Sequence, residues 1–347
     1  MDDTKFIGEI YDQPAALRTV VDYYSSGAGS MVLNHAIGAI RNAGKLIFTG
    51  MGTSLIVAFS VRNEMVSRVP SFEIWDAGEL FHFGLETIRD DTVVIVISQS
   101  GESAETRAVS KVIAGKNPII GIVNTIDSTI GHNADIILPI NGGDEASISN
   151  KTYTNTLAIL LMIADRLAGI PQETTAASLY ETADRMQESL DESAEQAAWA
   201  ARFFEGMTSL HVIARGRDLT TAEQCSLILK EGAVIAGQGT SAGLFRHGPI
   251  EIGGTGLAMA CIVSEDTRPD LTISLGEELA GMGSRVMVIG DRNYDTSLEK
   301  IVIPSPSPRY FPIACAPFIE LFVHEAAKQR GRTAGVFTKA VKVTNRE

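Results

Sequence analysis

The run Asp91-Thr92-Val93-Val94-Ile95-Val96-Ile97, followed at once by Ser98-Gln99-Ser100-Gly101-Glu102-Ser103, decides the fold that we expect for this chain. Uninterrupted β-branched residues of this kind are typical of a parallel strand that is buried on both faces. The segment after them is rich in hydroxyls, contains a glycine and opens a predicted helix, and helix N-termini present N–H groups that bind anions. An ordinary helix cap with turn residues is the alternative interpretation.

A second strand-to-helix turn of the same kind comes earlier in the chain. Lys45-Leu46-Ile47-Phe48-Thr49-Gly50 predicts a short apolar strand, which continues into Gly50-Met51-Gly52-Thr53-Ser54 and a new helix. This arrangement is how an α/β sheet offers N–H groups and hydroxyls to an anion. Two such turns in one domain favour a binding site over two unrelated helix caps. The candidate binding residues are Gly52, Thr53, Ser54, Ser98, Gln99, Ser100 and Ser103.

The rest of the chain predicts two similar α/β halves. Further strands are expected at 71–75, 118–123, 135–139, 209–214, 257–263, 285–289 and 300–303. Strands that alternate with helices favour doubly wound, flavodoxin-like parallel sheets with flanking helices. We expect a lead-in helix over 1–30 that breaks at Pro14, a first domain over 31–170, a helical connector over 171–197, a second domain over 198–330 and a tail over 331–347.

Composition narrows the class of function and the compartment. The net charge of −13 argues against a nucleic-acid surface, which relies on Lys and Arg. The three cysteines form no metal-like grouping, so we expect no metal and a reducing, cytoplasmic location. The acidic start Met1-Asp2-Asp3 has no apolar core after it, which predicts no signal peptide, and no apolar run is long enough to span a membrane.

Glu231 and His247 are the candidate acid–base residues. Glu231 lies among apolar residues at the end of a predicted helix (222–236), and burial raises the pKa of a carboxylate toward neutrality. A Gly/Ser/Thr-rich stretch, 237–243, is expected to form a loop that leads to His247, which Gly248-Pro249 follows. Histidine changes charge between pH 5 and 8. A solvated glutamate and a loop histidine without function are the alternatives.

Lys339 is a candidate nucleophile in the C-terminal tail. It lies in the apolar-rich stretch Val336-Phe337-Thr338-Lys339-Ala340-Val341, and desolvation lowers the pKa of a lysine amine enough for it to form a Schiff base. The alternative is an ordinary surface lysine.

Taken together, these motifs resemble the sugar isomerase (SIS) domain family. Gly50–Ser54, Ser98–Ser103 and the Glu231 to Pro249 block carry the likeness. The chain as a whole resembles the tandem-SIS isomerase half of glucosamine-6-phosphate synthase (glutamine–fructose-6-phosphate aminotransferase), from Glu9 to Lys339. We expect no glutaminase domain before residue 1, and we therefore expect that the chain is not a complete synthase.

The resemblance implies a role for each motif. Ser54, Ser98, Gln99, Ser100 and Ser103 match residues that hold the sugar phosphate. Glu231 matches the base that moves a proton between C1 and C2, and Lys339 matches a lysine that forms a Schiff base with the ketose. His247 matches the residue that opens the sugar ring and reaches in from a neighbouring subunit, which implies a homodimer with active sites at the subunit interface.

Differences from the family pattern leave the substrate open. Leu244 and Arg246 stand where the pattern has an acidic residue and a lysine, and the stretch Phe245–Ile252 is closer to fructosamine-6-phosphate deglycases. The leading expectation is a glucosamine-6-phosphate deaminase that needs no cofactor. A deglycase and a simple phosphosugar isomerase are the enzymatic alternatives. A non-catalytic phosphosugar-binding regulator is the alternative from another class.

Overall fold

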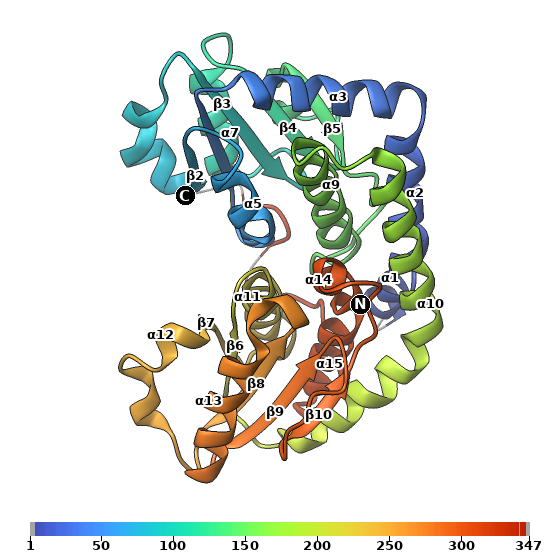
Figure 1. Ribbon diagram of the computed structural model, residues 1–347, viewed down its shortest axis with the longest axis vertical. Helices are drawn as coiled ribbons and strands as arrows, with labels where there is room; N and C mark the ends of the chain where they lie inside the picture. The colour runs from blue at the N-terminus through green and yellow to red at the C-terminus, as the bar shows by residue number, and fades with distance from the viewer. Residues whose placement is uncertain (1–3, 340, 345–347) are drawn as a thin grey trace. The chain divides into compact units, whose positions relative to one another are not determined.

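The computed structural model of the protein describes residues 4–339 and 341–344 and divides into two units (Figure 1). Unit A comprises Ala15–Glu145, Lys151–Tyr180 and the C-terminal stretch from Lys339. Unit B comprises the N-terminal segment up to Pro14, Ala146–Asn150 and Glu181–Thr338. Each unit contains one five-stranded sheet.

Unit A is built on a parallel sheet, here called sheet A, with the order β2-β1-β3-β4-β5. Its strands are β1 (Lys45–Gly50), β2 (Phe72–Asp76), β3 (Thr92–Ser98), β4 (Ile119–Val123) and β5 (Ile136–Pro139). Every residue of β1 and β3 is buried, as the β-branched run predicts for a central strand.

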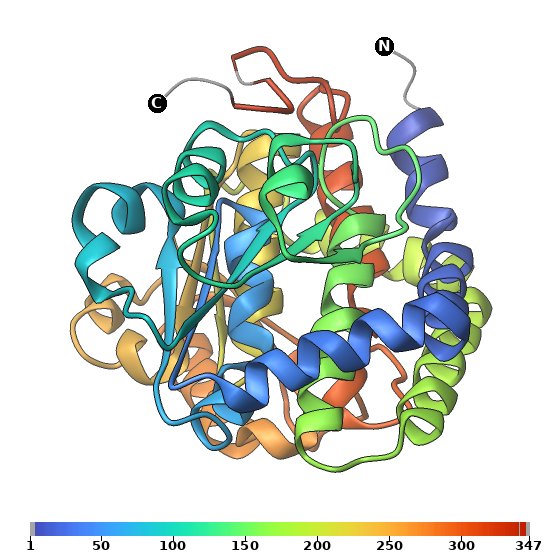
Figure 2. The same cartoon turned by 90° about the horizontal axis from the view of Figure 1, so that it is seen from above.

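Helices cover sheet A because alternate side chains of each strand point to opposite faces. On one face, Val94 and Val96 of β3 pack in a cluster with Val109 and Ile113 of α7 (Ala104–Ile113). The helix α3 (Gly27–Asn42) contacts both β5 and the buried helix α9 (Lys151–Leu167), and Figure 2 shows its course.

Unit B repeats this topology in sheet B, which has the order β10-β9-β8-β6-β7 and is also parallel. Its strands are β6 (Ser209–Ala214), β7 (Ala236–Ser241), β8 (Ala258–Val263), β9 (Arg285–Gly290) and β10 (Glu299–Val302). When the strands of each sheet are numbered 1 to 5 along the chain, both sheets have the order 2-1-3-4-5. The predicted pair of flavodoxin-like sheets is therefore confirmed.

Two details of the prediction near Glu231 are wrong. The stretch 237–243 is not a loop, because Ala236–Ser241 forms the edge strand β7. Its glycines allow a helix to approach closely: a Cβ at Gly237 would lie 2.4 Å from the carbonyl oxygen of Ser226, and one at Gly239 would lie 2.8 Å from Cα of Glu223. The glycines that suggest a loop are therefore packing residues of a strand.

The predicted helix over 222–236 has other bounds. The helix α11 runs over Asp218–Ile228 and continues as a π-helical turn over Leu229–Ala233. Val234 then adopts a left-handed conformation with φ of 53°, which ends the helical segment before β7.

The remaining longer helices frame the two sheets. The lead-in is two helices separated at Asp12, with Pro14 in the first turn of the second helix, where proline is tolerated. Their bounds and those of the other longer helices are α1 (Thr4–Tyr11), α2 (Gln13–Ser25), α10 (Gln172–Phe203), α13 (Pro269–Gly281) and α15 (Ala316–Gln329). None of the helices in the described part of the chain combines the length and apolar character needed to cross a bilayer.

A buried carboxylate joins two strand ends of sheet B. Asp218, the first residue of α11, accepts hydrogen bonds at Oδ2 from Thr267 Oγ1 (2.7 Å) and from Ser264 Oγ (2.8 Å). Burial raises the pKa of Asp218 to about 7, although the two hydroxyl hydrogen bonds favour its ionised form.

The raised pKa of Asp218 predicts a stability difference that depends on pH. In the unfolded chain an aspartate ionises near pH 3.9, so between about pH 4 and pH 7 the folded state binds more protons and the wild type loses stability as pH rises. Asp218→Asn keeps an oxygen for Ser264 and Thr267 but does not ionise. We expect its free energy of unfolding in urea, relative to wild type, to increase from pH 5 to pH 7 and to level off above pH 7. A difference that is the same at all pH values would contradict this prediction.

Candidate functional site

The candidate anion loops lie at the carboxyl edge of sheet A. The strands β1 and β3 are neighbours, and from them the sheet continues to β2 on one side and to β4 on the other. Their pairing extends to Thr49 opposite Val96, so both strands end at the same edge. In open α/β sheets, ligands bind in the crevice at this reversal of strand order. The loop 50–54 follows β1 and the loop 98–103 follows β3 at this point.

Glycine fixes the shape of the loop after β1. Gly52 has φ of 52° and ψ of −128°, a combination that other residues avoid. A Cβ at Gly50 would lie only 2.8 Å from the backbone of Ser54, so the chain can fold back closely only because Gly50 has no side chain. Thr53 and Ser54 follow in a short helical turn, and both are half-buried at its start.

The loop after β3 is held by backbone N–H donors, two from the loop itself and two from the turn after β4. Ser98 Oγ accepts from the N–H of Gly101 (3.1 Å), and Ser100 Oγ accepts from the N–H of Glu102 (3.1 Å). The carbonyl oxygen of Gln99 accepts from the N–H groups of Asn124 and Thr125, at 3.1 and 3.2 Å. A hydroxyl that accepts a bond in this way keeps its own proton to donate. The two serines can therefore donate to a bound anion without a change in the loop.

Glu102 is a loop residue that the sequence reasoning did not single out. Its carboxylate accepts from the N–H of Thr129 (2.5 Å) and from Thr129 Oγ1 (3.0 Å), at the first turn of α8 (Thr129–Asn133). The backbone hydrogen bond from Thr129 is the main cause that lowers the pKa of Glu102, so its ionised form is favoured. This contact ties the loop to the next strand-to-helix connection, and no local pattern in the sequence signals it.

Glu231 lies on the π-helical turn of unit B. Such turns are rare in proteins, and those that occur are often at functional sites. The turn packs against α15, because a Cβ at Gly232 would lie 2.6 Å from Cγ1 of Val323. Glu231 is half-buried, and burial raises its pKa to about 7, against a smaller opposing effect of Lys230. A carboxylate with this pKa can accept and return a proton at neutral pH.

His247 is exposed on the turn that follows β7 and the short helix α12 (Ala242–Phe245). Its backbone N–H donates to the carbonyl oxygen of Leu244 (2.9 Å). Gly248, with φ of 116°, then turns the chain into Pro249. Beside it, Arg246 Nη1 lies 2.6 Å from Glu278 Oε2 of α13, which anchors the turn to the body of unit B.

The predicted site residues are therefore divided between the units. Unit A contains the two loops at one sheet edge and also Lys339, which is exposed. Unit B contains Glu231 and His247, which flank β7 in the chain. The roles of all these residues stay predictions. Within residues 4–339 and 341–344, no three His, Cys, Asp or Glu side chains gather in a way that could hold a metal ion.

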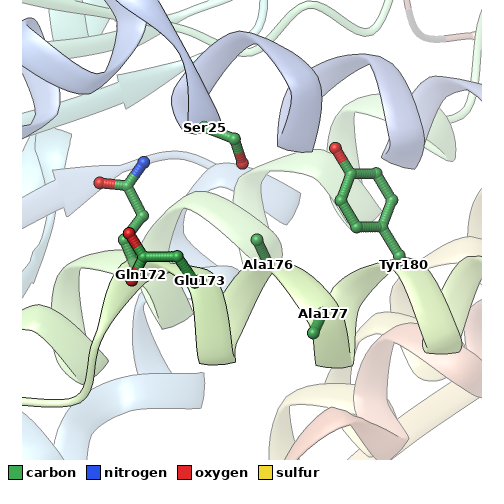
Figure 3. A pocket seen from close by; sticks show the side chains of 6 residues that line it. All are labelled: Ser25, Gln172, Glu173, Ala176, Ala177 and Tyr180. Atoms are coloured by element: carbon green, nitrogen blue, oxygen red, sulfur yellow. The ribbon is translucent and has the colours of Figure 1, made fainter.

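Unit A also has a cavity of about 280 Å³ between α2 and the start of α10 (Figure 3). Its lining comprises Ser25, Gln172, Glu173, Ala176, Ala177 and Tyr180. Gln172 Nε2 donates to the carbonyl oxygen of Tyr24 (2.5 Å), Gln172 Oε1 accepts from Ser30 Oγ (3.2 Å), and the hydroxyl of Tyr180 donates to Asp22. These groups already bond to protein, and the cavity contains none of the predicted site residues.

Comparison with known proteins matches both the domain and the wider chain. Residues 39–166 match the model of the SIS domain. Glutamine–fructose-6-phosphate aminotransferase [isomerizing] of Thermococcus kodakarensis is 30% identical over an alignment of 345 residues, and the match covers 93% of this chain and 55% of the relative. The chain thus spans about half the length of the curated relatives that it matches.

Solved structures share the fold along nearly the whole chain. Tagatose-6-phosphate ketose/aldose isomerase from Escherichia coli superposes with a TM-score of 0.82 at 17% identity, over 96% of this chain and 94% of that one. Glucosamine-6-phosphate deaminase from Thermotoga maritima superposes with a TM-score of 0.76 at 18% identity, over 98% of this chain and 99% of that one.

The sequence match, the SIS model and the two sheets of the same strand order agree. The chain carries a SIS domain in residues 39–166 and is homologous, over most of its length, to the isomerase domain of glutamine–fructose-6-phosphate aminotransferase.

Proposed function

We propose that the chain is a phosphosugar isomerase/deaminase that converts glucosamine 6-phosphate and water to fructose 6-phosphate and ammonia. The observation that carries the proposal is Glu231, a half-buried carboxylate whose pKa burial raises to about 7. Such a group can remove a proton from carbon and return it to a neighbouring carbon, which is the central step of aldose–ketose chemistry. The match to the SIS domain and the likeness to glutamine–fructose-6-phosphate aminotransferase support a phosphosugar as the substrate.

The proposed reaction begins when His247 assists opening of the sugar ring. Glu231 then removes the proton from C2 of the open-chain aldehyde, which gives an enolamine. Return of the proton to C1 gives the C2 imine of fructose 6-phosphate. Water adds to C2 of this imine, the C–N bond breaks and ammonia leaves, so the product carries a ketone at C2. Acid–base groups supply and remove the protons in each of these steps.

The phosphate of the substrate is assigned to the loops of unit A. The hydroxyls of Ser98 and Ser100 accept from loop N–H groups and keep their protons to donate. Gly52, Thr53, Ser54, Gln99 and Ser103 complete the proposed set at the same sheet edge. Hydroxyls and N–H groups at helix N-termini hold phosphate without a net positive charge, which suits a chain of net charge −13.

We further propose a homodimer in which each subunit supplies His247 to its neighbour. The exposure of His247 supports this, as do its neighbours Leu244 and Ile252, apolar side chains that are 66% and 51% exposed. Lys339 is proposed to form a Schiff base with the ketose, in which its amine condenses with the C2 carbonyl and water is released. Hydrolysis of the Schiff base returns the free ketose and the free lysine. The free, buried cysteines Cys225, Cys261 and Cys315 support a reducing, cytoplasmic location.

One observation favours a second candidate, a fructosamine-6-phosphate deglycase. Arg246 directly precedes His247 in the chain, and its guanidinium group forms an ion pair with Glu278. A guanidinium there offers planar donors to a carboxylate, which amino-acid adducts of fructosamine carry. The same carboxylate and histidine would act on either substrate.

The proposal is tested by ammonia release from glucosamine 6-phosphate, with fructose 6-phosphate detected in parallel. We expect wild type to form both in equal amounts and Glu231→Gln to lose about 10³-fold or more in kcat, because the amide cannot accept a proton. If wild type releases no ammonia, the deaminase assignment is wrong, and release of the amine from fructoselysine 6-phosphate would favour the deglycase. Binding of these phosphosugars without turnover of any would favour the regulator.

Glu231 also predicts the pH dependence of the reaction. The base must be ionised, so we expect kcat/KM to rise with pH and to level off above about pH 7, where burial places the pKa of Glu231. Glu223 is the matched control, since burial raises its pKa too. Glu223→Gln should keep the acidic limb of the profile and Glu231→Asp should move it. A limb that stays in place in Glu231→Asp would exclude Glu231 as the titrating base.

Gly101 gives a test of the phosphate loop. Gly101 and Gly115 are both left-handed, with φ of 69° and 72°, but a Cβ at Gly101 would lie 2.0 Å from Ser128 Oγ, whereas Gly115 has open space. We expect Gly115→Ala to cost about 1 kcal/mol of stability and Gly101→Ala about 2–4 kcal/mol. At a temperature where both fold, calorimetric titration with fructose 6-phosphate should show weaker binding only for Gly101→Ala. Equal affinities would remove this loop from the proposed site.

A further inference from the structure

Within unit A, the C-terminal segment of the chain contacts the first residue of α7, directly after the loop 98–103. The carbonyl oxygen of Thr344 accepts a hydrogen bond from the N–H of Ala104 (3.0 Å), and Ala104 is the first residue of α7, next to Ser103. Figure 2 shows this segment in red as it approaches the end of the chain. The tail therefore occupies one of the N–H groups that a helix leaves free at its N-terminus.

A buried carboxylate provides a second contact for the same segment. The side chain of Glu145 is fully buried, and that of Lys342 is 24% exposed, with its Nζ 3.8 Å from Glu145 Oε2. Glu145 also accepts from the N–H of Thr152 (3.1 Å) and from Thr152 Oγ1 (2.8 Å) in the first turn of α9. A buried carboxylate is costly unless charge and hydrogen bonds compensate it, and Lys342 places a positive charge next to this one.

These contacts restrict the position of Lys339. Lys342 comes three residues after Lys339, and three residues span about 10 Å at full extension. Lys339 itself is exposed, so packing around its side chain holds it only weakly. The contacts of Lys342 and Thr344 therefore limit where its amine can go. An exposed ion pair would hold the tail in place only weakly. Removal of one partner of a buried pair costs more, because it leaves an uncompensated charge.

We propose that Glu145 and Lys342 form a latch that holds the C-terminal segment against α7 and so positions Lys339 for the reaction. This inference rests on the proposed function for the role of Lys339, but the latch itself does not. Glu145 and Lys342 are positioning residues: neither needs to contact the substrate.

Limited trypsin digestion of the full chain tests the latch without any substrate. The readout is the rate of cleavage after Lys339, followed by mass spectrometry of the released peptides. Glu145→Gln removes the charge but keeps an oxygen for Thr152, and we expect cleavage to become about tenfold faster, because proteolysis tracks the population of the released segment. Lys342→Ala should act in the same way from the other side of the pair.

Asp270→Asn is the control, because it breaks an exposed ion pair. Arg268 Nη2 lies 2.8 Å from Asp270 Oδ2 in this pair. The variant should leave the rate of cleavage after Lys339 unchanged. Unchanged cleavage in Lys342→Ala would overturn the latch, even if Glu145→Gln folds poorly. A double-mutant cycle of Glu145→Gln with Lys342→Ala should show coupling, so that the double variant is cleaved no faster than either single one.

The positioning of Lys339 is tested separately by kinetics. If the latch acts through Lys339, Glu145→Gln should lower kcat about tenfold in wild type and have no effect in a Lys339→Ala background. Equal losses in both backgrounds would overturn the positioning role while leaving the latch in place. If the protein turns over none of the phosphosugars, the proposed function fails, and the digestion still decides whether the latch exists.

Discussion

The parallel pairing of β1 with β3 is the constraint on which the rest of unit A depends. It places Gly50 and Ser98, the last residues of two strands far apart in sequence, at one edge of the sheet. The strand order reverses at this pair, so the connections after the two strands leave toward opposite sides of the sheet, which is where open α/β sheets bind ligands. The glycine conformations and the serine hydrogen bonds matter only because this pairing brings their loops together.

Unit B has the same strand order as unit A, but a buried carboxyl group lies at the equivalent edge of its sheet. Ser54 follows the last residue of β1 by four positions (50 to 54), and Asp218 follows that of β6 by four (214 to 218). The carboxylate of Asp218 accepts the hydroxyl protons of Ser264 and Thr267. A buried carboxyl group of the protein thus uses hydroxyl donors of the kind that we propose for the phosphate in unit A. This contrast supports the assignment of phosphate binding to unit A alone.

The sequence predicts the parts of the structure that depend on local pattern. The β-branched run of β3 and the glycine turns predict buried strands and the loops that follow them. The residues of these loops also carry the resemblance to the SIS family. The strand β7 escapes prediction because Gly237 and Gly239 are selected by contact with α11, which local propensity does not register. The Glu102–Thr129 and Glu145–Lys342 contacts join residues far apart in the chain, so only the fold reveals them.

A raised pKa alone does not identify a catalytic base, because two carboxyl groups of this protein have a pKa of about 7. Burial shifts the pKa of Asp218 and of Glu231 to about the same value. Asp218 is fully enclosed and its charge is directed at two hydroxyls of the protein, so a substrate proton cannot reach it. Glu231 is only half-buried, on a π-helical turn. The same electrostatic shift is therefore structural at one position and available for proton transfer at the other, because accessibility separates the two.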